Sequence, residues 1–403
     1  MRVNRGVVKG SLILLIAFNV FNGLNFVFHF FMARMLSVSD YGILATLFTI
    51  TYVLAVFSES IQIVITKYSV QENEKGKLKN IIKKSFKKAF FVSVLLFVVY
   101  LAAAVPMSRI LEIKYLLVAL NGVILFSIFL SPVTRGVLQG KKRFKALGVN
   151  MAIEAVIKLC LAILFVYIGW RVYGALIGTL VGMGIALFAS FFSLGDIMKS
   201  KEEKSETSGI YGYSLPAFLI ILVILMFYSI DVIIVKILFP ADTAGVYAIA
   251  SILAKTIFFG TQPVSRAMFP ITAEGNGKDG KSKPDNAFMN AMMILIPMIV
   301  IALAVFYFAP NLIIKIFSGK ELGEAASILF YLGVAVSLIS FANLILLYKL
   351  SLGKIKRFYY LFVFLGVEIA LMIYFSANLF QFSIAFITSA AIFLWGAVFL
   401  MNE

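Results

Sequence analysis

Long apolar runs dominate this sequence of 403 residues, of which 62% are hydrophobic. A soluble domain has an apolar share nearer half, and about 20 consecutive apolar residues are enough for a helix to span a bilayer. Twelve runs of roughly that length can be recognised: 10–33, 43–66, 89–107, 115–136, 147–169, 173–194, 213–237, 246–270, 287–309, 325–348, 358–375 and 380–401. The sequence therefore predicts an all-α polytopic membrane protein with twelve transmembrane helices.

Two stretches half a chain length apart share one pattern of residues. The first carries His29, Arg34, Leu36, Asp40, Gly42 and Ala45, and the second carries Asp231, Lys236, Leu238, Asp242, Gly245 and Ala248. A second pair of stretches, 140–144 and 353–358, repeats a turn of glycine followed by basic residues and phenylalanine. Internal repeats of this size are typical of secondary transporters. We therefore expect two homologous six-helix bundles, residues 1–200 and 201–403.

The positive charge is distributed unevenly along the chain, whose net charge is +17. If the N-terminus is cytoplasmic, most of the 36 lysine and arginine residues fall in cytoplasmic loops. The outer turns then hold only Arg34, Arg109, Lys114, Arg171, Lys236, Lys315 and Lys320. This asymmetry predicts a plasma-membrane protein with both termini in the cytoplasm. Nucleic acid is excluded as a partner, because no loop is long enough to form a folded basic domain.

The longest charged connection, residues 71–88, alternates lysines with apolar side chains. This composition favours an interfacial helix whose lysines reach the anionic cytoplasmic leaflet, with membrane lipids as its partner.

Seven ionisable residues lie inside the predicted spans, where each costs about 2.5–3.5 kcal/mol at the bilayer centre. They are His29, Glu59, Glu154, Lys158, Asp231, Lys255 and Glu368. Either they pair across helices or they line a hydrated cavity between the two halves. Lys158 and Lys255 come from different halves and would suit an anionic headgroup near the midplane.

Spacing within single spans suggests further contacts. Glu154 precedes Lys158 by four residues, the order that favours an ion pair on one helix. Asn19, Asn22, Asn25 and His29 share one helical face of the first span, which points either to interhelical hydrogen bonds or to a cavity lining. Gly174, Gly178 and Gly182 form a ridge of small residues that predicts close helix packing.

Catalytic and cofactor motifs are not found in the sequence. His29 is the only histidine and Cys160 the only cysteine, which excludes histidine clusters and cysteine-based metal sites. No phosphate-cradling glycine loop or nucleophile–base arrangement is recognisable. The sequence thus predicts a transporter and no enzyme, with no cofactor and no ATP-driven step in this chain. An ion gradient, the membrane potential or the substrate's own gradient would supply the energy.

Four short motifs carry a resemblance to a known family. They are 36–42 (LSVSDYG), 229–231 with 245–247 (SID and GVY), 309–319 (APNLI to FSG) and 352–354 (LGK). With these motifs the chain resembles the polysaccharide-exporter branch, which includes the O-antigen flippases, of the multidrug/oligosaccharidyl-lipid/polysaccharide (MOP) exporter superfamily.

The resemblance implies a MATE-like protein whose two bundles surround a central cavity. Its cargo would be an oligosaccharide linked to lipid through phosphate or pyrophosphate, moved from the cytoplasmic to the outer leaflet by alternating access. Lys158, Lys255, Arg34 and Lys236 would hold the headgroup, with Asn22 and Asn25 lining the cavity. The resemblance also implies that the protein works together with glycosyltransferases and a glycan polymerase.

Two other functions remain open at this point. A cation-coupled multidrug exporter of the same superfamily would use buried acids, with Asp231 or Glu368, and also Glu59 and His29, as candidate carriers of H⁺ or Na⁺. A membrane glycan polymerase or ligase is disfavoured by the short outer loops. A major-facilitator transporter should carry a Gly-Asp-Arg-type motif, which residues 67–88 lack.

Overall fold

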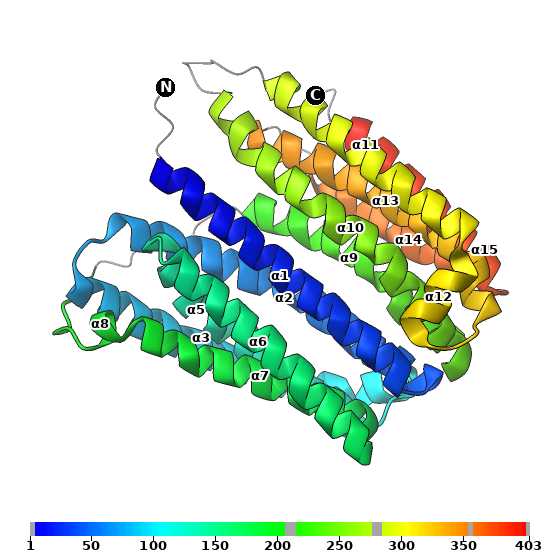
Figure 1. Ribbon diagram of the computed structural model, residues 1–403, viewed down its shortest axis with the longest axis horizontal. Coiled ribbons are helices and arrows are strands. Elements are labelled where there is room, and N and C mark those ends of the chain that lie inside the picture. Colours follow the sequence, from blue (N-terminus) through cyan, green and yellow to red (C-terminus); the bar gives the residue numbers. More distant parts are fainter. Residues whose placement is uncertain (1–4, 206–214, 276–283, 354–357, 400–403) are drawn as a thin grey trace. The chain divides into compact units, whose positions relative to one another are not determined.

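A computed structural model of the chain describes residues 5–205, 215–275, 284–353 and 358–399, and every regular element in these ranges is a helix (Figure 1). A helix satisfies its backbone hydrogen bonds internally, which is the condition for crossing a bilayer. Each of the twelve predicted spans falls largely on helix, and the all-helical membrane fold is confirmed. The second copy of the glycine–basic turn lies mostly outside the described residues, at 354–357.

The chain divides into two compact units. The first unit comprises Met1–Leu36 and Ile50–Ser214, and the second comprises Ser37–Thr49 and Leu215–Glu403. The first turns of the second helix therefore pack with the C-terminal half of the chain, although they precede it by a long stretch of sequence.

In residues 5–205, which hold the described part of the first unit, seven helices of more than one turn precede the short α8, with a π-helical turn between α6 and α7. They are α1 (Arg5–Met35), α2 (Val38–Gln71), α3 (Lys75–Ile110), α4 (Tyr115–Gly122), α5 (Ile124–Gly140), α6 (Phe144–Phe165), the π-helix η1 (Val166–Trp170), α7 (Arg171–Ser193) and α8 (Gly195–Met198). The fourth predicted span is thus made of two helices, α4 and α5.

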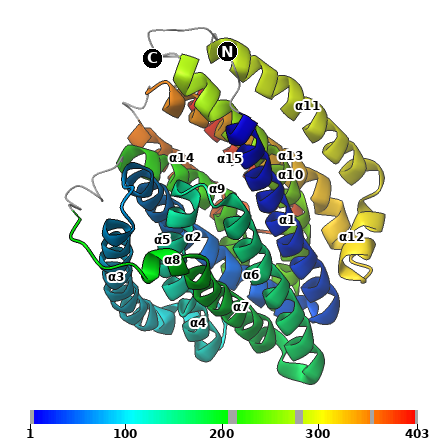
Figure 2. The same ribbon diagram turned by 60° about the vertical axis from the view of Figure 1, so that its left-hand side comes forward.

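Helices α6 and α7 form a tight antiparallel hairpin, with α1 alongside α6 (Figures 1 and 2). The predicted glycine ridge makes this approach possible. A Cβ atom on Gly174 would lie 2.8 Å from Phe165, one on Gly178 would lie 2.5 Å from Ala162, and one on Gly182 would lie 2.7 Å from the backbone of Lys158. The predicted close packing at these glycines is confirmed.

The lysine-rich segment before the third span is continuous with that span in one helix, and the contact of its lysines with the anionic leaflet stays a prediction. Residues 75–88 are the first turns of α3, whose 36 residues extend well beyond one membrane thickness. Leu78 and Ile82 are buried in the protein and pack with Val137, Leu194 and other apolar residues at one end of the unit. The apolar side chains Leu78 and Ile82 are buried in this core, while Lys83, Lys84, Lys87 and Lys88 remain at least partly exposed.

Ion pairs fasten α8 to the same end of the first unit. Arg143 donates two hydrogen bonds of 2.7 Å to the carboxylate of Asp196, and Lys75 lies 2.9 Å from it. These hydrogen bonds, those from Arg143 foremost, hold the pKa of Asp196 well below its usual range. Further along, Glu202 accepts a hydrogen bond from Asn80. The chain is therefore anchored to α3 until shortly before the second unit begins.

The described residues of the second unit from Leu215 onward form six longer helices and two short ones. They are α9 (Leu215–Leu238), α10 (Ala241–Gly275), α11 (Pro284–Phe308), α12 (Pro310–Ser318), α13 (Gly323–Ser351), the 3₁₀ turn η2 (Phe358–Tyr360), α14 (Leu361–Tyr374) and α15 (Leu379–Phe399). Helix α10 packs along α13, and α13 along α15. Fully buried phenylalanines fill the interior of the unit, and the rings of Phe227 and Phe393 stack 4.2 Å apart.

The two copies of the repeated motif meet within the second unit. Gly42 in the first turns of α2 faces Gly245 in the first turns of α10, and a Cβ on Gly42 would lie 2.9 Å from the Gly245 Cα. A Cβ on Gly245 would lie 2.1 Å from the carbonyl oxygen of Val38. A side chain at either position would separate the backbones, so glycine is required where the two copies cross.

Candidate functional site

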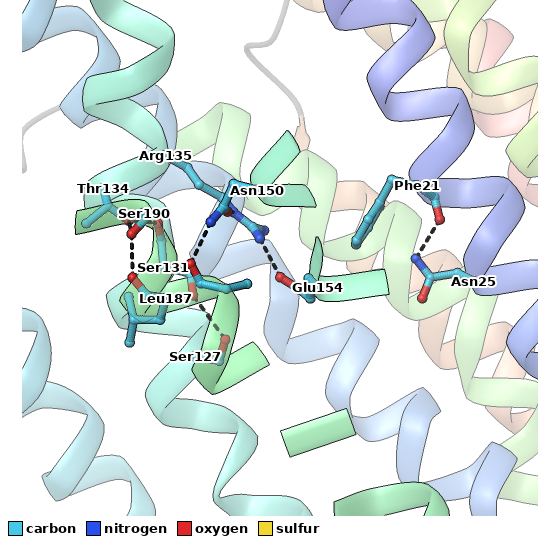
Figure 3. A network of polar contacts seen from close by, with 11 residues as sticks. Phe21, Asn25, Ser127, Ser131, Thr134, Arg135, Asn150, Glu154, Leu187 and Ser190 are labelled. Atoms are coloured by element: carbon cyan, nitrogen blue, oxygen red, sulfur yellow. Dashed lines mark hydrogen bonds and ion pairs between the residues drawn. The ribbon is translucent and has the colours of Figure 1, made fainter. Parts of the chain in front are cut away.

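The first cluster of buried polar groups is centred on Lys158 of α6. Its ammonium group donates a hydrogen bond of 2.9 Å to Asn25 Oδ1 on α1 and lies 4.2 Å from the ring centre of Phe28. The amide of Asn25 is oriented by its other end, because Nδ2 donates to the carbonyl oxygen of Phe21 at 2.9 Å (Figure 3). Asn25 and the aromatic ring are both neutral, so they orient the ammonium without cancelling its charge.

His29 belongs to the same cluster. It is one turn beyond Asn25 on α1, is buried, and lies within electrostatic range of Lys158. The polar face predicted on the first span therefore supplies two groups, Asn25 and His29, to the surroundings of one buried lysine.

The ion pair predicted between Glu154 and Lys158 is wrong. Glu154 accepts a hydrogen bond from the guanidinium of Arg135 on α5 and forms its ion pair there (Figure 3). Arg135 Nε also donates to Asn150 Oδ1 at 2.9 Å, and Asn150 Nδ2 donates to the carbonyl oxygen of Ala186 on α7 at 2.5 Å. The interhelical pair prevails over the one on α6 because the planar guanidinium bonds the carboxylate and the amide together.

Three formal charges thus lie in the described part of this cluster: Arg135, Glu154 and Lys158. Lys158 is only 6% exposed, and in such surroundings a positive charge interacts with an anion far more strongly than it would in water.

The second cluster is centred on Asp231 of α9, which is completely buried. Its carboxylate accepts hydrogen bonds from Tyr247 Oη at 3.0 Å, Ser251 Oγ at 2.8 Å and Lys255 Nζ at 2.8 Å. These three donors are spaced four residues apart on α10 and therefore lie on one helical face. The ammonium of Lys255 also lies 5.0 Å from the ring centre of Tyr228.

Glu368 of α14 adds a second acid to this cluster. It lies within electrostatic range of both Asp231 and Lys255 and is completely buried. In the described part of the chain, no hydrogen-bond donor reaches either of its carboxyl oxygens. Burying an ionised carboxylate without hydrogen-bond donors costs free energy. The position therefore favours a protonated Glu368, or a donor that reaches it in another conformation of the protein.

Comparison with known proteins identifies the family. The model of the polysaccharide biosynthesis protein family matches residues 31–327. The chain belongs to this family. A membrane protein of Methanocaldococcus jannaschii, itself uncharacterized, is 27% identical over 286 residues, which are 65% of this chain and 66% of that protein. The match therefore spans just under two thirds of the relative's length.

Solved structures show the same fold as this polysaccharide biosynthesis family member. An inward-facing multidrug resistance MATE transporter of the MOP superfamily covers 94% of both chains with a TM-score of 0.78 at 17% identity. An outward-facing MATE transporter of that superfamily gives a TM-score of 0.70 at 18% identity, covering 100% of this chain and 99% of that one. The predicted MATE-like fold is confirmed, and the protein is a multi-pass membrane protein of the polysaccharide biosynthesis family.

The remaining predicted site residues of this family member are Asn22 and Arg34 on α1, Glu59 on α2 and Lys236 on α9. Asn22 is half-buried, Glu59 is exposed, and Lys236 is buried near the end of α9. Arg34 is exposed, and its guanidinium lies 4.4 Å from the ring centre of Phe30. Their roles in substrate binding or ion coupling stay predictions.

Several groups of the two clusters are not among the residues predicted from the sequence, and Arg135, Tyr247 and Ser251 are three of them. Arg135 falls at the edge of a predicted cytoplasmic loop, although it lies inside α5 with a largely buried side chain. Tyr247 and Ser251 are spaced four residues from each other and from Lys255, which places them on the face that carries this lysine. That spacing could have revealed the α10 face, whereas nothing in the sequence indicates that Arg135 bonds Glu154.

Proposed function

We propose that this protein is a flippase that moves a lipid-linked oligosaccharide from the cytoplasmic to the outer leaflet by alternating access. The observation that carries this function is the buried Lys158, whose charge is oriented by Asn25 and Phe28 while the neighbouring carboxylate is bonded by Arg135. The family supports a polysaccharide precursor as cargo.

The headgroup would bind at the ammonium group of Lys158. A phosphate or pyrophosphate link carries negative charge and several acceptor oxygens, which suit an ammonium group oriented by neutral neighbours. The lipid tail would stay in the bilayer, so the protein needs only to shelter the charged and sugar-bearing part.

Lys255 is predicted from the sequence to share this role, and its contacts support a different one. Its ammonium neutralises Asp231 inside the second unit. We assign the second cluster to ion coupling, with Glu368 as the group that takes up and releases a proton. Lys255 already supplies the positive charge at Asp231, which favours a proton over a metal cation as the coupling ion.

Replacement of Lys158 tests the proposed function. Lys158→Ala should lower the export of glycan to the cell surface by at least about tenfold, because a hydrogen bond between charged groups contributes about 1.5–3 kcal/mol. Lys158→Arg should retain part of the activity. The measurement is surface glycan in cells that depend on this protein, with membrane insertion checked by immunoblotting.

Lys142→Ala is the matched control, since Lys142 is exposed in the turn between α5 and α6. Undiminished surface glycan in the Lys158→Ala strain, at normal protein level, would contradict the flippase function.

A cation-coupled drug exporter is the second candidate, favoured by the buried acids Asp231 and Glu368 together with the fold of MATE transporters. Expression in a drug-sensitive host separates the two functions. Resistance to cationic dyes that depends on Asp231, without any effect on surface glycan, would favour the exporter of drugs.

A further inference from the structure

Asp231 accepts more hydrogen bonds than its counter-ion alone would supply. Lys255 Nζ, which neutralises the carboxylate, lies at 2.8 Å. Tyr247 Oη at 3.0 Å and Ser251 Oγ at 2.8 Å donate to it as well. Glu368, the second acid of the cluster, is equally buried and has no hydrogen-bond donor among the described residues. One acid therefore has three donors while the other has none.

We propose that Tyr247 and Ser251 are positioning residues that stabilise the ionised Asp231 after its lysine has left. The ammonium group of Lys255 moves to Glu368 when this acid releases its proton, and it returns to Asp231 when Glu368 is protonated again. This inference rests on the assignment of the second cluster to proton coupling in the proposed function. It adds the two residues that make the exchange of the ammonium group possible.

Lysine is suited to such an exchange because its ammonium group is carried on a flexible stem of four carbons. Glu368 lies within electrostatic range of both Asp231 and Lys255. All of these residues belong to the second unit, in which α9 packs against both α10 and α14. The two acids thus lie on helices that can present them to one lysine.

The two hydroxyl groups matter most once the lysine has moved. A buried carboxylate that lacks hydrogen bonds is costly, and an ionised carboxyl group has about four acceptor sites. With Tyr247 and Ser251 in place, Asp231 keeps two of its three donors when Lys255 leaves. Without them, the departure of Lys255 would leave the buried carboxylate with no described donor.

The repeated motif indicates that the helix scaffold does not require these donors. Alignment of Gly42 with Gly245 places three residues of the first copy opposite the donors of Asp231: Leu44, Phe48 and Tyr52. None of the three carries a charge, and the first copy has His29 at the position of Asp231. The glycine is common to both copies, whereas the donor set is found only where the acid is. The donors therefore serve the acid and not the crossing of the helices.

The elements packed against α14 bring few other ionisable groups near Glu368. They are α9, α15 and η2. Besides Asp231, α9 carries Tyr228 beside the Lys255 ammonium and Lys236 near its end. Residues Leu379–Phe399 of α15 include no ionisable side chain, and the tyrosines of η2 lie about two helical turns before Glu368. Asp231 and Lys255 are therefore the charges that govern the protonation of Glu368.

Infrared spectroscopy of the purified full-length protein in liposomes follows the proton on Glu368. A protonated carboxyl group has a C=O stretching band that the ionised carboxylate lacks, and the band that Glu368→Gln removes belongs to Glu368. We expect this band in the wild type at low pH and its loss as the pH is raised.

Tyr247→Phe/Ser251→Ala should retain the Glu368 band to a pH that is higher by about one unit. Loss of the two donors disfavours the state in which Asp231 lacks its lysine, and a hydrogen bond to a charged group typically changes an equilibrium by about tenfold or more. Asp231→Asn should shift the loss of the band to lower pH, because Lys255 then pairs with Glu368 alone. A purely structural role of the hydroxyl groups predicts lower thermal stability without these opposite shifts.

Thr261→Val is the matched control on the same helix. Thr261 is buried, and its hydroxyl group donates to carbonyl oxygens of α10 itself, those of Ile257 at 2.9 Å and Phe258 at 3.1 Å. This variant should titrate like the wild type. Ser251→Thr, which keeps a hydroxyl group at the site, should also titrate close to the wild type.

Tyr247→Phe alone serves if the double variant does not purify as a monodisperse species. It keeps the ring that packs edge-on against Phe382 at 5.4 Å between ring centres. It should give a smaller shift in the same direction as the double variant. Identical titration of the wild type, Thr261→Val and the variants without these hydroxyl groups would overturn the inference, as would a wild type with no Glu368 band at any pH.

Flux of a fluorescent lipid-pyrophosphate saccharide in proteoliposomes separates the inference from the proposed function. If the opposite shifts appear but the saccharide is not transported, the flippase function is contradicted and the exchange of Lys255 stands. If a pH difference drives transport but Tyr247→Phe/Ser251→Ala titrates like the wild type, the proposed function stands and the positioning role is contradicted.

Discussion

At the residue scale, buried charges in this protein are arranged in two different ways. In the second cluster Lys255 cancels Asp231, with Tyr247 and Ser251 completing the hydrogen bonds of the carboxylate. In the first cluster Arg135 bonds Glu154, and Lys158 donates a hydrogen bond to Asn25. This difference, a lysine bonded to a carboxylate against a lysine bonded to an amide, separates the proposed roles of ion coupling and headgroup binding.

Removing Lys255 should destabilise the protein strongly, because it leaves a completely buried Asp231 without its counter-ion. We expect Lys255→Ala to cost about 3–5 kcal/mol, the usual result of breaking a buried pair. Lys255→Ala/Asp231→Asn should recover most of that loss, since the double variant buries no unpaired charge. Thermal unfolding in detergent, compared with wild type, measures both effects. A double variant as unstable as Lys255→Ala would show that the pair is not what stabilises this site.

At the element scale, the α6–α7 hairpin places the Lys158 cluster. Helix α7 lies against α6 at Gly182, opposite the backbone of Glu154 and Lys158. A Cβ on the neighbouring Gly184 would meet no atom within 4 Å, so this glycine lies on an open face of the same helix. The two glycines provide a matched comparison within one helical turn.

Gly182→Ala should therefore impair the protein, whereas Gly184→Ala should not. The added methyl group at Gly182 would lie 2.7 Å from Lys158 N and 2.9 Å from Glu154 O, and backbone atoms cannot move aside without separating the helices. We expect Gly182→Ala to be destabilised by about 1–3 kcal/mol, with glycan export reduced in parallel. Indistinguishable melting temperatures for the two variants would mean that the hairpin tolerates a wider separation.

At the scale of the whole molecule, the proposed export needs an energy source, and Glu368 is the described group best suited to couple it to a proton gradient. Its carboxyl group is buried, lacks a donor among the described residues, and lies within electrostatic range of Asp231 and Lys255. Protonation of Glu368 removes the cost of burying its charge. After deprotonation, Glu368 competes with Asp231 for the ammonium group of Lys255. A change of proton occupancy would thus alter the contacts between α9, α10 and α14.

Glu368→Gln should remove the dependence of transport on a proton gradient while the protein remains folded, because glutamine imitates the neutral acid permanently. The measurement is flux of a fluorescent lipid-pyrophosphate saccharide in proteoliposomes, with and without a pH difference across the membrane. Glu321→Gln is the control, since Glu321 is exposed and paired with Lys315. Undiminished acceleration of Glu368→Gln by the pH difference would exclude Glu368 as the coupling group.

The sequence by itself determined the membrane class, the helices and the family resemblance, because these depend on properties that are local along the chain. Long apolar runs must become helices in a bilayer whatever their neighbours are. The glycine ridge at 174–182 likewise required only a fixed helical spacing, and the structure places it against α6 as expected.

Only the tertiary structure decided which charges meet. The pattern on α6 favoured Glu154 with Lys158, but Arg135 from α5 bonds the carboxylate instead. The lysines of 75–88 indicated an interfacial helix, but the apolar residues among them pack against α8 and neighbouring helices as part of α3. Interhelical contacts join residues far apart in sequence, and in a low-dielectric interior the strongest of them outweigh the weak preferences of a single helix.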